Sequence, residues 1–86
     1  MAGIDSEEYS IGSASDNLLC LAGDPHVSAY HAIIRYDNGL LMLADQNSTN
    51  GTIVNSEVVR GGIRMLYAGD QIRIGATTLE LSLPTE

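Results

Sequence analysis

The sequence predicts an all-β protein, and two observations carry that prediction. Apolar residues recur in short runs with a period of two, most clearly where Leu79, Leu81 and Leu83 alternate with polar residues, which is the pattern of a strand with one buried face. Clusters of Gly, Asn, Asp and Ser separate the runs at intervals of about ten residues. Many short strands with such turns indicate an antiparallel sandwich or a small barrel.

The expected strands follow from the runs in chain order. They occupy residues 18–22, 32–36, 40–44, 52–54, 64–67, 71–74 and 77–83. Asp37-Asn38-Gly39 between the second and third runs predicts a tight hairpin, because Asn and Gly adopt the positive φ that such turns need. Asn50-Gly51 predicts another turn before the run at 52. We expect flexible ends at 1–8 and 84–86 around one domain at 9–83.

Composition and charge exclude several classes of protein. The 86 residues contain 4 Arg, no Lys and 11 acidic residues, for a net charge of -7, which argues against nucleic-acid binding because phosphate neutralisation needs a basic face. No apolar run approaches the ~20 residues of a membrane span, and the acidic start predicts no signal peptide. The single Cys20 excludes an internal disulfide and indicates a reducing, cytoplasmic setting. We expect Cys20 to be buried and inert.

The sequence offers little for catalysis or metal binding. Asp24, Ser28 and His31 have the residue types of a hydrolase triad, but lie within eight residues on one segment and cannot easily reach the mutual geometry it needs. His31 has no accompanying ligand cluster, so we expect it to support a loop by hydrogen bonding. We therefore predict no catalytic residue, no metal and no cofactor.

Polar motifs at the ends of the runs carry a resemblance. These motifs are Ile11-Gly12, Ser28-x-x-His31-Ala32, Asp45, Ser48-Thr49-Asn50-Gly51-Thr52-x-Val54-Asn55 and Leu66-x-x-Gly69-Asp70-x-Ile72-x-Ile74-Gly75. In this order and spacing, over residues 9–83, the chain resembles a forkhead-associated (FHA) domain. The resemblance implies an eleven-stranded β-sandwich whose loops at one end recognise phosphothreonine in an extended peptide of a protein partner.

The resemblance also implies roles for individual residues. Ser28 and Thr49 would place hydroxyl groups on the phosphate, and Asn50 would hold its loop and bind the peptide main chain. The phosphopeptide-binding positions also include Ser13 and Ala29, which lie in the first two loops of this set. The loops would be supported from behind by three residues, Gly12, His31 and Gly51. Ser28 has a simpler alternative as a turn serine bonded to its own backbone.

Two positions depart from the family pattern. The pattern places a phosphate-binding arginine where this chain has Ser13, and often a basic or amide residue where it has Ala29. A charge-assisted arginine contact contributes roughly 1.5–3 kcal/mol, so we expect weakened phosphate recognition. We expect Arg60 and Arg64 to be solvated and away from the phosphate loops, and therefore to be poor substitutes.

Two functions follow from these observations. The chain is either a non-catalytic module that recognises phosphothreonine weakly, or a phosphorylation-independent scaffold or oligomerisation domain in a signalling or secretion assembly. Few residues precede Ile11, so we expect the first strand of the sandwich to be short or missing. An unpaired neighbouring edge would then favour a weak homodimer through residues 77–83.

Overall fold

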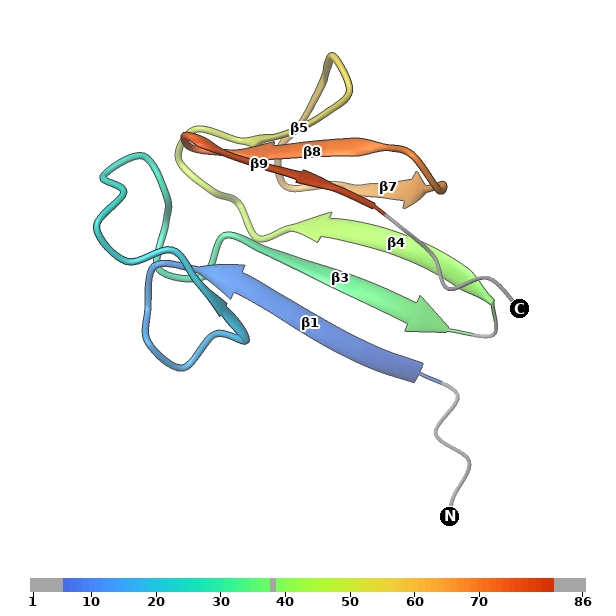
Figure 1. The fold of residues 1–86 in the computed structure, drawn as a ribbon, viewed down its shortest axis with the longest axis horizontal. Coiled ribbons are helices and arrows are strands. Elements are labelled where there is room, and N and C mark those ends of the chain that lie inside the picture. Colours follow the sequence, from blue (N-terminus) through green and yellow to red (C-terminus); the bar gives the residue numbers. More distant parts are fainter. Residues whose placement is uncertain (1–5, 38, 82–86) are drawn as a thin grey trace.

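Two β-sheets packed face to face form the domain in the computed structural model, which describes residues 6–37 and 39–81 (Figure 1). The strands of this described part are β1 (Ser6–Gly12), β2 (Leu19–Cys20), β3 (Ala32–Asp37), β4 (Leu40–Asp45), β5 (Thr52–Val54), β6 (Glu57–Val59), β7 (Ile63–Leu66), β8 (Gln71–Ile74) and β9 (Thr77–Glu80). Within these residues there is no helix, and hence none with the length and apolarity to cross a bilayer. The predicted all-β sandwich is confirmed.

Each sheet has a simple order. One sheet has five strands in the order β2-β1-β3-β4-β7, and the other has four in the order β6-β5-β8-β9. All neighbours are antiparallel except β1 and β2, which pair in parallel over two positions. The hairpin of β3 and β4 is in register from Ala32 opposite Asp45 to Asp37 opposite Leu40, and Gly39 in its turn has φ of 83°.

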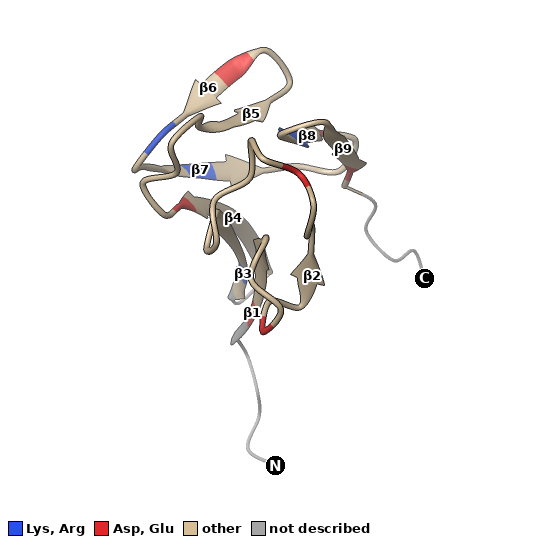
Figure 2. Cartoon of the chain, turned by 90° about the vertical axis from the view of Figure 1, so that its left-hand side faces the viewer, with Lys and Arg blue, Asp and Glu red and all other residues tan. Residues whose placement is uncertain are grey.

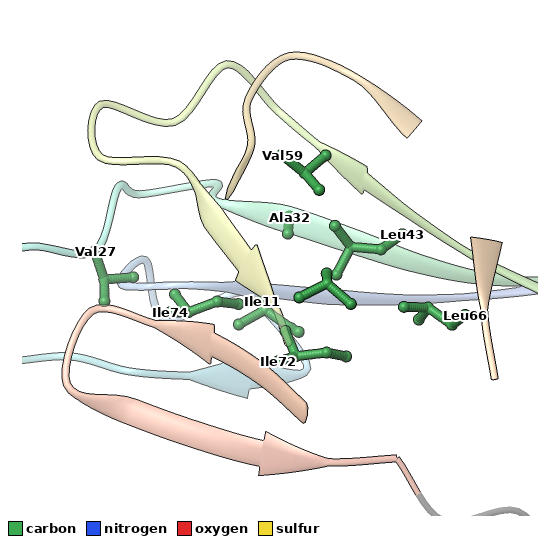
Figure 3. Close-up of a cluster of buried hydrophobic side chains, with 9 residues drawn as sticks. Ile11, Val27, Ala32, Leu43, Val59, Leu66, Ile72 and Ile74 are labelled. Carbon is green, nitrogen blue, oxygen red and sulfur yellow. The ribbon is translucent and has the colours of Figure 1, made fainter. Parts of the chain in front are cut away.

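The core lies between the sheets and is entirely aliphatic. Strand alternation directs Ile11, Ala32 and Leu43 inward from the five-stranded sheet, and each is at most 1% exposed (Figure 3). The other sheet contributes its own fully buried residues in the same way, namely Val54, Ile72 and Ile74. Val27 closes the core at the loop end. Complete burial of each large side chain stabilises the fold by roughly 1.5–3 kcal/mol.

The structure differs from the expected strands in three places. The run at 18–22 contracts to the two residues of β2, and β6 had not been expected. Strand β1 was not among the expected runs. It contains Ile11 itself, so the described residues hold no separate strand before Ile11, where a short or missing first strand was expected. It begins at Ser6, three residues before the expected domain start, and pairs with β3 from Ser6 to Ile11. The structure describes nine strands, against the eleven implied by the resemblance. Residues 1–5 and 82–86, which include most of the expected flexible ends, lie outside the described residues.

The expectation for Cys20 is wrong, since this thiol is exposed. Neighbouring side chains of a strand point to opposite faces, so Leu19 of β2 is partly buried and Cys20 points outward. Strand β2 lies at the edge of its sheet. The Cys20 Sγ lies 3.6 Å from the carbonyl oxygen of Ser13.

Candidate functional site

Three loops meet at one end of the sandwich, seen at the left of Figure 1. They are residues 13–18, 21–31 and 46–51. The first two are joined because the N–H of Ser13 donates to the carbonyl of Ser28 at 3.0 Å, with a second such bond from Ala14 to Ala29. The second and third are joined because the N–H of Thr49 donates to the Ser28 hydroxyl at 3.1 Å. The loops therefore form one continuous surface.

His31 lies beneath this surface and is fully buried. Its Nδ1 accepts the N–H of Ser28 at 3.0 Å, so the ring hydrogen must lie on Nε2, which then donates to the carbonyl of Gly51 at 3.0 Å. The backbone N–H of His31 donates to Ile11, and its carbonyl accepts from Gln46. One residue thus ties β1 to the second and third loops.

Asp45 holds the third loop from below. Its carboxylate accepts the N–H and hydroxyl of Ser48 at 2.9 and 2.7 Å, the Thr52 hydroxyl at 2.7 Å and the N–H of Gly61 at 2.9 Å. Burial favours the neutral acid, but the hydrogen bonds from Ser48, Gly61 and Thr52 outweigh it and lower the pKa of Asp45 below its ordinary value. The Ser48 hydroxyl in turn accepts the N–H of Gly51 at 2.9 Å.

The sequence signal for Asp45 is an acidic residue at a strand end, followed by Ser48 at the third position and Thr52 at the seventh. Asp in this setting commonly accepts hydrogen bonds from the next turn of backbone. Asp45 belongs to the motif quoted from the sequence, and no role was predicted for it there.

Two glycines permit the close packing of the loops. A Cβ on Gly12 would overlap the carbonyl oxygen of Ala29, so a side chain there would push the first two loops apart. Gly51 has φ of +81° and would bring a Cβ within 3.0 Å of the Val58 side chain, so its turn also favours glycine. The side-chain amide of Asn17 reinforces the first junction by donating to Ala14 and Ala29.

The outer surface of the loops presents polar groups. Thr49 and Asn50 are exposed and Ser28 is half-buried; together with three further residues, Pro25, His26 and Val27, they line a recess of about 130 Å³. The Asn50 side chain donates to the carbonyl of His26 at 3.1 Å. His26 and Asn50 also line a second recess of about 340 Å³, whose far wall includes Arg73. The two recesses are therefore neighbours along one surface.

The expectation for Arg60 is right in one part and wrong in the other, because its side chain is exposed as expected but lies against the third loop. Its guanidinium donates to the carbonyl of Thr49 at 2.6 Å, which places the basic segment between β6 and β7, blue in Figure 2, against the third loop. Sequence order could not reveal this, because Arg60 is brought there by the hairpin of β5 and β6. Arg64 is also not simply solvated, since it is half-buried and pairs with Glu57 at 2.9 Å and Asp70 at 3.6 Å.

The geometry of the suspected triad is not that of a hydrolase. His31 Nδ1 accepts the backbone N–H of Ser28, whose hydroxyl faces Thr49 instead. The Asp24 carboxylate accepts the N–H groups of Ala76 and His26, and these bonds lower the pKa of Asp24. Among the described residues there is no cluster of three or more acidic, His or Cys side chains able to hold a metal ion.

A β-sandwich that displays hydroxyl and amide groups on loops fixed from beneath has the architecture typical of recognition domains. The family model of the FHA domain matches residues 9–75, so this chain belongs to the FHA domain family. The resemblance found in the sequence is thus confirmed.

Relatives agree with this assignment. The chain is 48% identical over 52 residues, 60% of its length, to the FHA domain-containing protein FhaA of Mycobacterium tuberculosis, and 44% identical over 46 residues, 52% of its length, to the probable serine/threonine-protein kinase fhkA of Dictyostelium discoideum. The matches span only 10% and 8% of those two proteins.

Solved structures share the fold. An FHA domain studied for phosphothreonine-dependent interactions matches with a TM-score of 0.82 and 37% identity, covering 92% of this chain and 79% of its own. The N-terminal FHA domain of S. cerevisiae Rad53p, solved with a phosphothreonine peptide, matches with a TM-score of 0.73 and 29% identity, covering 81% of this chain and 57% of its own.

Proposed function

We propose that this domain binds phosphothreonine peptides of a protein partner through the surface formed by Ser28, Thr49 and Asn50. The single observation that carries the proposal is the bond from the Thr49 N–H to the Ser28 hydroxyl, which holds two hydroxyl-bearing residues side by side on a fixed surface. Both hydroxyls can donate to phosphate oxygens. Solved relatives described as phosphothreonine-dependent, or bound to a phosphothreonine peptide, support the same reading.

Asn50 would hold the main chain of the bound peptide. Its amide nitrogen is already engaged with His26, which fixes the orientation of the side chain. Its amide oxygen makes no hydrogen bond to any residue that the structure describes, and so can accept a peptide N–H. A side chain oriented before binding loses little entropy when the peptide arrives.

Charge limits the affinity. Ser13 and Ala29 lie at the junction of the first two loops. Both side chains are uncharged, so neither residue supplies a cation to the phosphate. Neutral hydrogen bonds contribute about 0.5–1.5 kcal/mol each, against roughly 1.5–3 kcal/mol for charged ones. Arg60, held on the Thr49 carbonyl, contributes positive charge from the other side. We infer weak, phosphate-dependent binding.

A second candidate is a scaffold that binds its partner without phosphate. Ser13 and the net charge of -7 favour it, since both disfavour a dianionic ligand. In either case we infer that the domain acts by binding and not by catalysis. We place it in the cytoplasm, where the exposed thiol of Cys20 stays reduced.

Titration with a phosphothreonine peptide library and its unphosphorylated twin, followed by amide chemical shifts, tests the proposal. We expect phosphate-dependent shifts at Ser28, Thr49 and Asn50, with a dissociation constant weaker than about 10 μM. Thr49→Val removes one hydroxyl and should weaken binding further. The matched control Thr78→Val, on the exposed face of β9, should not.

Equal binding of the two peptides at these loops would favour the phosphate-independent scaffold. A low-micromolar or tighter constant would show that the missing arginine at position 13 has been replaced by another cation.

A further inference from the structure

A second surface of the molecule is an open sheet edge. Strand β9 ends its sheet and pairs only with β8, from Gln71 opposite Glu80 to Ile74 opposite Thr77. Within the described part of the chain, no strand covers its other edge. The peptide groups that point away from β8 are therefore available to pair with another strand.

An apolar groove of about 490 Å³ lies directly beside this edge, between the two sheets. Its floor and walls come from both sheets, with Tyr9, Leu19 and Ile34 on one side and Ile72, Leu79 and Leu81 on the other. Figure 2 shows β2 and β9 on the same side of the sandwich. The volume falls within the range of roughly 300–1,000 Å³ that is typical of small-molecule pockets.

The open edge of β9 and the apolar groove beside it suit the same kind of ligand. An edge strand offers backbone hydrogen bonds to an extended chain, and a strand added there points every second side chain toward the opposite sheet. We propose that an extended, neutral or basic segment of a partner chain, with apolar side chains at alternate positions, binds along β9 as a further strand and fills this groove.

Charge disfavours a second copy of this chain as the occupant. The net charge of -7 on each copy opposes association, and with the exposed Glu80 at the rim it favours a partner segment without acidic residues.

A designed peptide tests the proposal directly. The probe has nine residues, with valine and threonine alternating between terminal lysines, and the control replaces the central valine by proline, which removes a backbone donor and cannot lie within a paired strand. We expect the probe to shift the amides of Thr77–Glu80 and Leu19. Hydrogen exchange at the outward amides of β9 should slow at least tenfold, and the proline peptide should do neither.

Two matched substitutions place the site. Leu79→Glu puts a charge into the groove and should abolish binding, whereas Thr78→Glu adds the same charge to the exposed face of the same strand and should retain most of it. Leu79→Ala, which removes apolar contact without adding charge, should weaken binding by an intermediate factor. Unchanged amide shifts in the β3–β4 hairpin verify that each variant is folded.

Three results would overturn the proposal. These are equal binding of the proline peptide, shifts confined to the Ser28 and Asn50 loops, or loss of binding in Thr78→Glu to the same extent as in Leu79→Glu. A dimer seen by sedimentation, with β9 protected from exchange in proportion to protein concentration and without peptide, would assign the edge to a second copy instead.

Discussion

The loop end and the open side of the sandwich are stabilised in opposite ways. At the loop end, most buried polar groups are paired, with Asp45 accepting four hydrogen bonds and His31 contacting three segments. The exception is the buried amide oxygen of Asn17, which has no partner among the described residues. At the open side, Leu79 and Leu81 pack only partly against the core, and no strand of the described residues covers the outer edge of β9. Hydrogen bonds therefore dominate one end, and a partly covered apolar surface the other.

The difference has a physical basis. Loops cannot bury much apolar surface, so a rigid loop surface must be built from hydrogen bonds, and buried ones must be fully satisfied to be favourable. A sheet edge beside an apolar groove gains stability only when more chain covers it. The loop end is therefore suited to a small polar epitope, and the open side to an extended apolar one.

The largest expected effect comes from breaking the loop end at Asp45. Asp45→Asn removes the charge and leaves four donors with weaker or missing acceptors, so we expect a loss of roughly 3 kcal/mol or more in the free energy of unfolding. Denaturant unfolding measures it. Asp16→Asn is the matched control, since Asp16 is exposed and bonds only to Tyr30 among the described residues; a similar loss there would contradict a special role for Asp45.

Adding a cation tests whether the loop surface is otherwise ready for phosphate. Ser13→Arg should raise phosphopeptide affinity by about 1.5–3 kcal/mol, or roughly 10- to 150-fold. Ala29→Arg should add less, and Ala68→Arg, which adds the same charge on the turn between β7 and β8, should add little. Unchanged binding in a folded Ser13→Arg protein would show that the loop geometry does not suit phosphate.

Removing the support beneath the loops should cost stability. His31→Ala leaves the N–H of Ser28 and the carbonyl of Gly51 without their partner, so we expect a loss of about 1–3 kcal/mol. A loss of this size lowers the melting temperature by about 4–8 °C per kcal/mol in a domain of this length. His26→Ala, at an exposed histidine, is the control. An unchanged melting temperature in His31→Ala would remove the supporting role.

Acid should weaken the domain through its paired carboxylates. Hydrogen bonds lower the pKa of Asp24, Asp45 and Asp70 in the folded state, so their stabilisation is present above the unfolded pKa of about 3.9 and is lost as pH falls through the folded values. The free energy of unfolding should be level above about pH 5 and decline below about pH 4. The decline should be shallower in Asp45→Asn; an identical slope would show that Asp45 titrates normally.

The smallest expected effect concerns Arg60. Arg60→Gln removes a surface charge beside Thr49, worth about 0.2–1 kcal/mol, so phosphopeptide affinity should fall by roughly 1.5- to 5-fold, and less at high salt. Arg35→Gln removes the same charge from β3, where Arg35 pairs with Glu8, and should leave affinity unchanged. If both substitutions lowered the affinity equally, Arg60 would act only through the long-range attraction between the domain's positive charge and the phosphate.

The sequence by itself determined the sandwich and the positions of most strands. Alternation and turn residues are local properties, so runs such as 52–54 and 71–74 match β5 and β8 residue for residue. The motif order likewise identified the family, and it selected the loops that meet at one end. The roles of Ser28, Thr49 and Asn50 in binding remain predictions.

Only the tertiary structure decided what depends on pairing between distant segments. The place of β2 in its sheet exposed Cys20, and the β5–β6 hairpin placed Arg60 beside Thr49. The outer place of β9 in its sheet left it an edge that no strand of residues 6–37 and 39–81 covers. Asp45 became the centre of the third loop because the chain returns Gly61 to it. Periodicity reports which face of a strand is buried, whereas neighbours across a sheet are set by long-range packing that no local pattern encodes.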